Sequence, residues 1–326
     1  MDTPAGDPLR RASLLSVVLP VYNERDVLSA LTDRLVTTLQ PLGLPFELVF
    51  VDDGSRDGSG EVLDLLAARQ PAVRVVHLSR NFGHQAAIQA GLMFARGEAI
   101  VIMDSDLQDA PEAIPTFLAE WERGWDVVYA IRAQRKEGLW KRALFSLFYR
   151  GLRQVADTKL PVDSGNFGLI DRRVRDAITD LGEHDRYYPG LRAWVGFRQK
   201  GIVVERQARY DGRPRVGVGG LFRLAATAVF SFSAFPLRFF YIVALASIAK
   251  CLFVSVFTLY QNIFTHTASP GWTSDLLSIG FFGAINALGI YVLGEYVIRI
   301  YDEVRRRPIF LVQRTVNCDD AAEPES

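Results

Sequence analysis

Residues 14–131 alternate between short apolar runs and longer amphipathic stretches. The apolar runs, rich in Val and Ile, predict strands at residues 15–20, 47–52, 73–78, 99–104 and 126–131. The stretches between them predict helices near residues 25–40, 58–69, 84–95 and 112–123. Short buried strands joined by helices are typical of a mostly parallel sheet with right-handed crossovers, so we predict an α/β fold.

Two longer apolar runs follow, at residues 239–260 and 277–298, and each is long enough to cross a bilayer. Arginines precede the first run and follow the second, whereas residues 261–276 between them carry no Lys or Arg. This distribution predicts a two-helix transmembrane hairpin with both ends in the cytoplasm. The expected organisation is a tail (1–13), a cytoplasmic α/β domain (14–215), a juxtamembrane interfacial segment (216–235), the hairpin (236–300) and a cytoplasmic C-terminal tail (301–326), acidic and disordered after Asn317.

Lys250 lies near the middle of the first apolar run, where a charge costs roughly 2.5–3.5 kcal/mol on insertion scales. Counted from the cytoplasmic ends of the two runs, Lys250 and Asn286 share a depth, so we predict that they are in contact within the hairpin or across subunits. The alternative is a neutral or snorkelling lysine that faces lipid. The small residues Gly280, Gly283 and Ala287 indicate helix packing in the second run.

The stretch at residues 139–155 is amphipathic, with Trp140, Leu144, Phe148 and Leu152 at helical spacing beside several basic residues. This pattern is typical of an interfacial helix on an anionic membrane surface. It also fits an ordinary amphipathic helix packed on the domain. The interfacial segment 216–235 has a weaker version of the same pattern and is expected to lead into the bilayer.

The composition of the chain excludes several classes of protein and argues against a nucleic-acid partner. The 326 residues are 49% hydrophobic, with a mean hydropathy of +0.11, which excludes a disordered or collagen-like chain. The 37 basic residues are balanced by 37 acidic ones, which argues against a nucleic-acid partner. Cys251 and Cys318 lack the spacing of a zinc site or a disulfide framework, and the N-terminus lacks a signal peptide, so we expect a reducing, cytoplasmic location for the first domain.

Polar side chains follow the first four predicted strands, at the edge where a parallel sheet binds its ligands. They are Pro20, Tyr22 and Glu24, then Asp52 and Asp53, then Arg80 and Asn81, and finally Asp104, Ser105, Asp106 and Gln108. Four carboxylates converging from two strand ends repel one another and call for a cation or hydrogen-bond donors. The Asp104-x-Asp106 pair with Gln108 offers the hard oxygen ligands that Mg²⁺ or Mn²⁺ accepts while bridging substrate phosphates.

An isolated Asp-x-Asp is also a common turn sequence after a strand. The second acidic pair at another strand end favours a functional site over a plain turn. The chain lacks the glycine-rich GxGxxG and GxxxxGK[ST] loops and the GxSxG nucleophile elbow, so dinucleotide, P-loop and serine-hydrolase chemistry have no support.

Four runs together resemble the family 2 glycosyltransferases of the GT-A fold. They are VVLPVYNE (17–24), VDDGSRDGS (51–59), LSRNFGHQAAIQAGL (78–92) and MDSDLQDAPE (103–112). Four later runs resemble the polyprenyl-phosphate branch of that family: DSGNFGLIDRR (163–173), RAWVGF (192–197), SFSAFPLR (231–238) and GEYVIRIYDEVRRRP (294–308). The resemblance covers residues 14–308 and is greatest to the bactoprenol glucosyltransferases of bacteria, which are related to the dolichol-phosphate mannose synthases.

The resemblance implies a Rossmann-like GT-A domain and a role for each matching residue. The donor nucleotide would contact Pro20, Tyr22, Glu24, Asp52 at the base edge, Asp53 beside the ribose, Asn81, Asp104 and Ser105, while Asp106 and Gln108 would ligate Mg²⁺ or Mn²⁺. Phosphates of donor and acceptor would contact Arg132, Arg135, Lys136, Arg206, Arg209 and Arg215, of which the last three could equally be membrane-surface charges. Asp163 would act on the acceptor side beside the catalytic Asp104, Asp106 and Arg132, although Asn166 replaces a second Asp of many relatives.

The implied reaction is inverting transfer of a hexose to undecaprenyl phosphate at the cytoplasmic face of the bacterial inner membrane. UDP-glucose is the favoured donor, with GDP-mannose and a UDP-N-acetylhexosamine as alternatives. A phosphate monoester is largely dianionic at pH 7 and needs little help from a base, so the metal and arginines would mainly stabilise the leaving diphosphate. The resemblance also implies a homotetramer in contact with membrane lipid, and as working partners a flippase and a downstream membrane glycosyltransferase.

Two rival functions differ in class. A processive polysaccharide synthase would carry a QxxRW sequence and more membrane spans than two, and the chain has neither. A catalytically silent membrane scaffold that only binds a nucleotide is disfavoured by the intact Asp104, Asp106 and Gln108. Metal-dependent hydrolysis of the donor would distinguish an enzyme from a scaffold.

Overall fold

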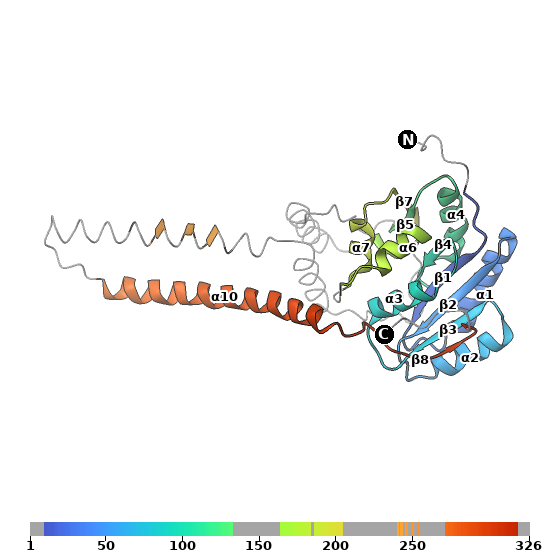
Figure 1. Ribbon diagram of the computed structural model, residues 1–326, viewed down its shortest axis with the longest axis horizontal. Coiled ribbons are helices and arrows are strands. Elements are labelled where there is room, and N and C mark those ends of the chain that lie inside the picture. Colours follow the sequence, from blue (N-terminus) through green and yellow to red (C-terminus); the bar gives the residue numbers. More distant parts are fainter. Residues whose placement is uncertain are drawn as a thin grey trace. The chain divides into compact units, whose positions relative to one another are not determined.

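A computed structural model describes residues 10–132, 164–183, 186–204 and 271–318, together with residues 240, 242, 243, 245, 246, 249, 250 and 253. The chain forms two compact units (Figure 1). The first unit comprises Met1–Tyr149, Thr158–Gly217 and Arg307–Ser326. The second comprises Arg150–Asp157 and Val218–Arg306.

The first unit is built on a mixed sheet with the strand order β7-β5-β6-β4-β1-β2-β3-β8. Its strands are β1 (Leu15–Val21), β2 (Phe46–Asp52), β3 (Val73–Leu78), β4 (Ala99–Ile102), β5 (Val127–Arg132), β6 (Ser164–Asp171), β7 (Gln199–Val204) and β8 (Val312–Val316). The pairs β4–β1, β1–β2, β2–β3 and β5–β7 are parallel, so the predicted mostly parallel sheet is confirmed. Two strands run the other way: β6 lies antiparallel between β4 and β5, and β8 lies antiparallel beside β3.

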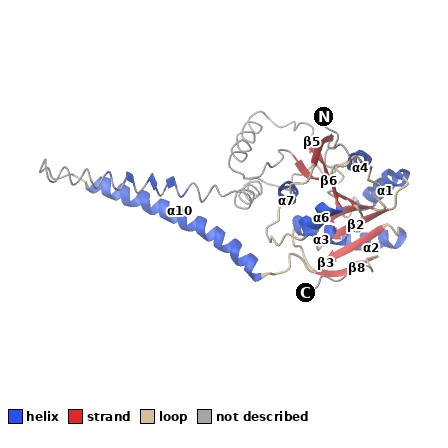
Figure 2. Cartoon of the chain, turned by 45° about the horizontal axis from the view of Figure 1, so that its top comes forward, coloured by secondary structure: helices blue, strands red, loops and turns tan. Residues whose placement is uncertain are grey.

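Helices cover both faces of this sheet. They are α1 (Leu28–Leu39), α2 (Ser59–Arg69), α3 (His84–Phe94), α4 (Ile114–Glu122), α6 (Arg172–Thr179) and α7 (Tyr188–Trp194), with 3-10 turns at Gln40–Leu42 and Pro111–Ala113. In Figures 1 and 2, α1, α2 and α4 lie on one face of the sheet and α3 and α6 on the other. Every residue of β1 is therefore buried, which explains its continuous apolar sequence. The four helices predicted from residues 14–131 are confirmed as α1 to α4.

The C-terminal range 301–326, which we expected to be a tail, contributes β8 to the sheet. Val75 pairs with Val316 and His77 with Arg314, so residues after the second apolar run form an edge strand beside β3. The pattern VQRTV gave no strong strand prediction because its middle three residues face solvent. Residues 319–326 lie outside the described residues.

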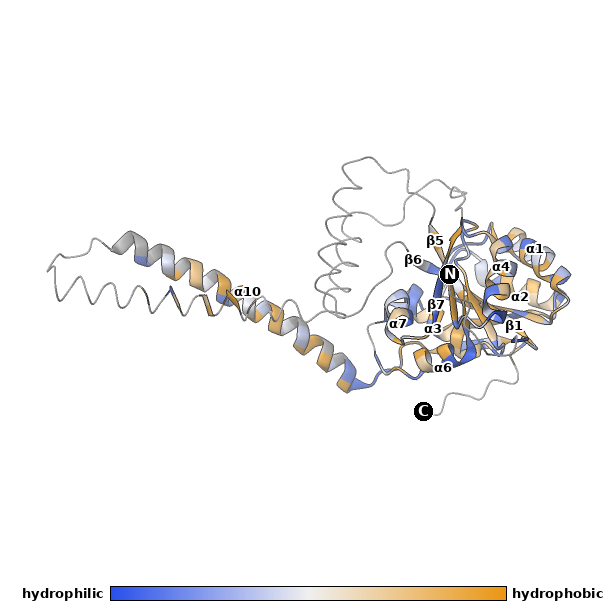
Figure 3. Ribbon diagram, turned by 90° about the horizontal axis from the view of Figure 1, so that it is seen from above, coloured by the Kyte–Doolittle hydropathy of each residue, from blue (hydrophilic) through white to orange (hydrophobic). Residues whose placement is uncertain are grey.

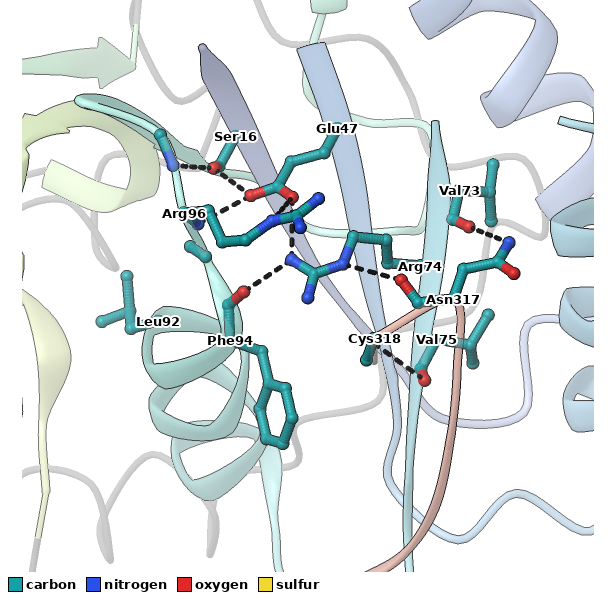
Figure 4. A network of polar contacts seen from close by, with 12 residues as sticks. Ser16, Glu47, Val73, Arg74, Val75, Leu92, Phe94, Arg96, Asn317 and Cys318 are labelled. Atoms are coloured by element: carbon teal, nitrogen blue, oxygen red, sulfur yellow. Dashed lines mark hydrogen bonds and ion pairs between the residues drawn. The ribbon is translucent and has the colours of Figure 1, made fainter. Parts of the chain in front are cut away.

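A buried polar network ties the end of β8 to the amino ends of the central strands (Figure 4). Glu47 accepts hydrogen bonds from Ser16 Oγ at 2.6 Å, Arg74 Nη1 at 2.7 Å and Arg96 N at 2.7 Å. Arg74 in turn donates to the carbonyl oxygen of Asn317 at 3.1 Å. Because Glu47 and Arg74 are both buried, each provides the charge that the other requires away from water.

The second unit contains α10 (Trp272–Arg305), and its segment Phe281–Arg305 is, among the described residues, the one helix long and apolar enough to cross a membrane. Apolar residues run along α10 up to a hydrophilic C-terminal end (Figure 3). Several of its apolar side chains are exposed, among them Ile279, Val297 and Val304. The predicted first span, 239–260, lies mostly outside the described residues, so the transmembrane hairpin stays a prediction.

Contacts of the described residues near 240–250 run antiparallel to α10. The ammonium of Lys250 lies 5.4 Å from the ring centroid of Phe281 and 5.1 Å from that of Phe282. A Cβ atom on Gly289 would lie 3.6 Å from the ring of Phe240. Lys250 thus has aromatic faces as cation–π partners, and its predicted contact with Asn286 stays a prediction.

The two amphipathic segments, 139–155 and 216–235, lie outside the described residues, as do Asp163, Arg135, Lys136, Arg206, Arg209 and Arg215. Their predicted roles therefore stay predictions.

Candidate active site

The carboxyl ends of β1, β2 and β4 are joined to one another by short hydrogen bonds. The Asp53 N–H donates to the carbonyl oxygen of Val21 at 2.9 Å, which holds the end of β2 to the end of β1. The Ser105 hydroxyl donates to the carbonyl oxygen of Pro20 at 2.8 Å. Ser105 is buried, so its side chain braces two loops, and a donor contact there would fall to its backbone. The predicted convergence of these strand ends is confirmed.

Asp53 holds the loop that follows β3. Its two carboxylate oxygens accept the N–H groups of Phe82 at 2.7 Å and Gly83 at 3.0 Å, and the side chain is buried. Burial raises the pKa of Asp53, and the neighbouring Asp52 adds to this, so the two N–H groups offset only part of the shift. Both oxygens of Asp53 thus accept backbone hydrogen bonds, and its predicted ribose contact stays a prediction.

Gly54 allows the loops after β2 and β3 to touch. Its φ is +65°, in the left-handed region, and a Cβ atom there would lie 2.5 Å from the backbone carbonyl carbon of Arg80. A residue with a side chain would clash with the backbone that leads into Asn81. The glycine of the VDDGS run is therefore required by the close approach of these two loops.

Asp52 is the other carboxylate at the end of β2. Its oxygens accept hydrogen bonds from Ser55 N at 2.9 Å and pair with His77 Nδ1 at 3.0 Å. Burial alone would raise the pKa of Asp52, but the hydrogen bonds from His77 and Ser55 outweigh it and lower the pKa. Asp52 is thus a fixed, ionised carboxylate at the predicted nucleoside pocket, and its base-reading role stays a prediction.

The turn after β4 carries the predicted metal ligands. Asp106 Oδ1 accepts the Gln108 N–H at 3.1 Å, and Leu107 between them has a φ of +59°, which closes a tight turn. Asp104, Asp106 and Gln108 are all half-buried, so the turn is partly open to solvent. In the part of the chain that the structure describes, no cluster of three or more His, Cys, Asp or Glu side chains could hold a metal by itself. A metal at this turn fits if substrate phosphates complete its ligands, as Mg²⁺ sites commonly require.

His84 is a site residue that the sequence analysis did not assign. It is the first residue of α3, and its Nε2 lies 3.4 Å from Asp104 Oδ1 and 2.8 Å from Asn166 Nδ2 on β6. Burial lowers the pKa of His84, but Asp104, Asp53 and Asp106 together raise it above its ordinary value. Its position directly after the RNFG run, at a strand end, is the sequence feature that could have indicated it.

The remaining described site residues differ in exposure. Tyr22 and Asn81 are exposed, and Glu24 is half-buried with its N–H donated to Ser59 Oγ at 3.0 Å. Arg132 is the last residue of β5, where it pairs with Val204 of β7. The side chains of Tyr22, Asn81 and Glu24 therefore lie at the surface near the carboxyl ends of the strands. For Arg132 only the backbone position is described.

Arg192, the first residue of the RAWVGF run, is fully buried on α7. Its guanidinium lies 4.6 Å from the ring centroid of Tyr129 and donates to the carbonyl oxygen of Gly165 on β6 at 3.3 Å. Burial lowers the pKa of Arg192 and raises that of the neighbouring Tyr188 to about 12. Arg192 thus fixes β6, which carries Asn166, against β5 and α7.

The family model of glycosyl transferase family 2 matches residues 16–179, a range that contains the carboxyl ends of β1 to β4 and the loops that follow them. The chain belongs to this family. The mostly parallel mixed sheet with helices on both faces is accordingly the GT-A glycosyltransferase fold.

Similar proteins extend the match over nearly the whole chain. An uncharacterized glycosyltransferase of Bacillus subtilis, YkcC, is 38% identical over 312 residues, covering 94% of this chain and 95% of its own length. A prophage bactoprenol glucosyl transferase homolog of Escherichia coli is 33% identical over 301 residues, covering 92% and 98%. The solved mannosyltransferase PcManGT of Pyrobaculum calidifontis, in complex with GDP-Man and Mn²⁺, is 17% identical, with a TM-score of 0.47, and covers 91% of this chain and 90% of its own.

Proposed function

We propose that this glycosyltransferase transfers glucose from UDP-glucose to undecaprenyl phosphate, with inversion, at the cytoplasmic face of the bacterial inner membrane. The observation that carries the proposal is the half-buried Asp104–Gln108 turn beside Asp52 and Asp53 at one edge of the sheet. The relatives named bactoprenol glucosyl transferase support the acceptor and the sugar, since they match more than nine-tenths of the chain. GDP-mannose and a UDP-N-acetylhexosamine are the alternative donors.

Asp106 and Gln108 would hold Mg²⁺ or Mn²⁺ together with the donor diphosphate. The ion would supply Lewis-acid stabilisation of the departing nucleoside diphosphate. Asp104, in this turn, would orient His84, which also contacts Asn166 of β6, so that the pair could direct the donor phosphates. Asp52 and Tyr22, at the ends of β2 and β1, would bind the nucleoside, with Glu24 and Asn81 at the rim.

The acceptor phosphate is itself the nucleophile. Because it is largely dianionic at pH 7, its oxygen can attack the anomeric carbon directly, and the bond to the nucleoside diphosphate breaks on the opposite side. Asp163 then has an orienting role on the acceptor side, and Arg132, Arg135, Lys136, Arg206, Arg209 and Arg215 would offset the repulsion between the two anionic substrates. Single displacement of this kind inverts the anomeric centre.

Membrane attachment would bring the enzyme to its lipid substrate. The exposed apolar side chains of α10 and its length support insertion of Phe281–Arg305 into a bilayer. With the apolar run at 239–260, this would make a multi-pass hairpin whose two ends, and the catalytic unit, are cytoplasmic. A homotetramer, a flippase and a downstream membrane glycosyltransferase are further parts of the proposal.

The test is a transfer assay with the full-length protein in detergent. Radiolabelled UDP-glucose, GDP-mannose and UDP-N-acetylglucosamine are each incubated with undecaprenyl phosphate and Mg²⁺ or Mn²⁺, and lipid product is extracted into organic solvent. We expect product from UDP-glucose, sensitivity to chelation, and a loss of about 10–100-fold or more in Asp106→Ala. Asp26→Ala, a change at an exposed carboxylate of the same unit, is the matched control.

If only GDP-mannose or only UDP-N-acetylglucosamine gives product, UDP-glucose is the wrong donor, and sugar transfer to undecaprenyl phosphate is still the reaction. Nucleotide binding without transfer or hydrolysis of any donor would indicate a silent scaffold. Full activity in Asp106→Ala would contradict the metal role of the turn.

A further inference from the structure

We propose that β8, the strand that follows the apolar helix α10 in the chain, is a working part of the donor site, and that Arg314 is a positioning residue for Asp52. This inference rests on the proposed nucleoside-binding role of Asp52. It assigns to residues 311–318 a function in donor affinity rather than that of a tail. The experiment below separates its failure from failure of the proposed reaction.

Four side chains from four elements form a continuous chain of polar contacts. Arg314 on β8 donates to both oxygens of Asp64 on α2, at 3.1 and 2.5 Å. Asp64 Oδ1 lies 3.0 Å from Nε2 of His77 on β3. His77 Nδ1 lies 3.0 Å from Oδ2 of Asp52 at the end of β2.

The strand register makes these contacts a consequence of β8 pairing. Arg314 is the direct partner of His77 in the antiparallel β3–β8 ladder, so their side chains project from the same face. Asp64 lies above that pair on α2 and receives both of them. If β8 were absent, Asp64 would keep the His77 ring as its described side-chain partner.

The inner half of this chain leaves little freedom for Asp52. His77 is 4% exposed and Asp52 is 6% exposed. A Cβ atom on Gly60, in the first turn of α2, would lie 3.0 Å from Asp52 Oδ2 and 3.5 Å from His77 Cε1, so α2 closes over the pair. The His77 ring lies between the carboxylates of Asp52 and Asp64, so it holds Asp52 in one orientation as long as Asp64 is itself held in place. Arg314 is the residue that holds Asp64.

A second contact joins the segment just before β8 to the loop that follows β3. The Ser79 N–H donates to the carbonyl oxygen of Leu311 at 2.9 Å, just before the segment that contains Asn81 and the N–H groups bound by Asp53. At the other end of β8, the Asn317 amide donates to the carbonyl oxygens of Ala67 and Val73 at 3.0 and 2.9 Å. The strand is anchored at both ends, so its register beside the site is set.

The experiment compares Arg314→Ala with Gln313→Ala, its exposed neighbour on β8. In Arg314→Ala of the full-length enzyme we expect the KM for UDP-glucose to rise about tenfold, which equals about 1.4 kcal/mol, and the Kd for UDP measured by calorimetry to rise in parallel. The kcat and the KM for undecaprenyl phosphate should stay within twofold. Arg314→Lys should recover most of the affinity because an ammonium can still donate to Asp64, and Gln313→Ala should behave as wild type.

Three outcomes would overturn the inference. They are unchanged UDP affinity in Arg314→Ala, an equal loss in Gln313→Ala, and a lowered Tm with proportional loss of kcat but no change in either KM, which would mark a structural role. If the wild type transfers no sugar but its UDP affinity falls in Arg314→Ala and recovers in Arg314→Lys, the proposed reaction is wrong and the positioning role of Arg314 is supported.

Discussion

Replacing Glu47 by alanine should unfold the first unit at a markedly lower temperature. Glu47 is 2% exposed and accepts hydrogen bonds from Ser16, Arg74 and Arg96, while Arg74 is 1% exposed. Truncation would leave the Arg74 guanidinium buried, with the carbonyl oxygens of Phe94 and Asn317 as its remaining acceptors. Removing one partner of a buried ion pair costs about 3–5 kcal/mol, because the remaining charge is uncompensated.

This free energy converts into a measurable shift. For a unit of about 150–250 residues, 1 kcal/mol changes Tm by roughly 2–4 °C, so the expected drop is about 6–20 °C. The assay is a thermal melt of the full-length protein in detergent at pH 7. Glu61→Ala, at an exposed position on α2, serves as the control and should change stability by less than about 0.5 kcal/mol.

Activity below the melting temperature provides an independent check. The network lies at the amino ends of β1, β2 and β3, whereas the site lies at their carboxyl ends. The donor KM of folded Glu47→Ala should therefore equal that of wild type. A Tm shift below 2 °C, or one no larger than in Glu61→Ala, would refute the assignment of the network as a major source of stability.

Three further outcomes are expected. Burial would raise the pKa of Glu47, but Ser16, Arg96 and Arg74 lower it overall. The stability that ionised Glu47 contributes is therefore complete above the ordinary pKa of 4.5 and is lost as the pH falls through the lower pKa of the folded state. In melts recorded at stepped pH, the Tm difference between wild type and Glu47→Gln should shrink over that acidic range. Gly54→Ala should raise the donor KM and cost at least about 1–2 kcal/mol, whereas Gly43→Ala, at a similar φ of +62° with open space around it, should cost stability without changing KM in the transfer assay. His84→Ala should lower kcat about tenfold or more, because a hydrogen bond to a charged group contributes about 1.5–3 kcal/mol; an unchanged rate would exclude His84 from the reaction.

The sequence was sufficient for the parts of the fold whose signal is local. Strands β1 to β4 are almost fully buried, and β5 is an apolar run that is half-buried at Tyr129 and Ile131, so the positions of all five could be predicted to within a few residues. The strands β6, β7 and β8 were not predicted. For β8 the reason is that its middle residues face solvent and that pairing with β3, more than two hundred residues earlier, holds it as a strand. No local pattern carries that pairing.

The candidate site divides in the same way. The residues of the Asp104–Gln108 turn and the Asp52–Asp53 pair follow strands directly, so spacing alone brought them to one edge. His84, Arg192 and His77 were not assigned a role, because each acquires it from partners on other elements: Asp104 and Asn166, Tyr129 and Gly165, and Asp52 and Asp64. The sequence also could not show that the Ser105 hydroxyl and the Asp53 carboxylate are used within the protein, since those partners are backbone groups.

The chain returns to the sheet after α10 and changes which strand forms its edge. Without β8, the row of backbone groups along β3 would be an open edge, and unpaired edges invite association with other strands. β8 pairs with β3 and becomes the edge itself, as a short strand of five residues with the polar, exposed Gln313 and Thr315. The same segment supplies Asn317 to the Arg74 network and Arg314 to the Asp64–His77–Asp52 chain. The Arg74 network at one end of β3 and the proposed donor positioning at the other thus both involve residues that the chain reaches only after α10. The first unit is complete only when the residues that follow α10 in the sequence have been synthesised.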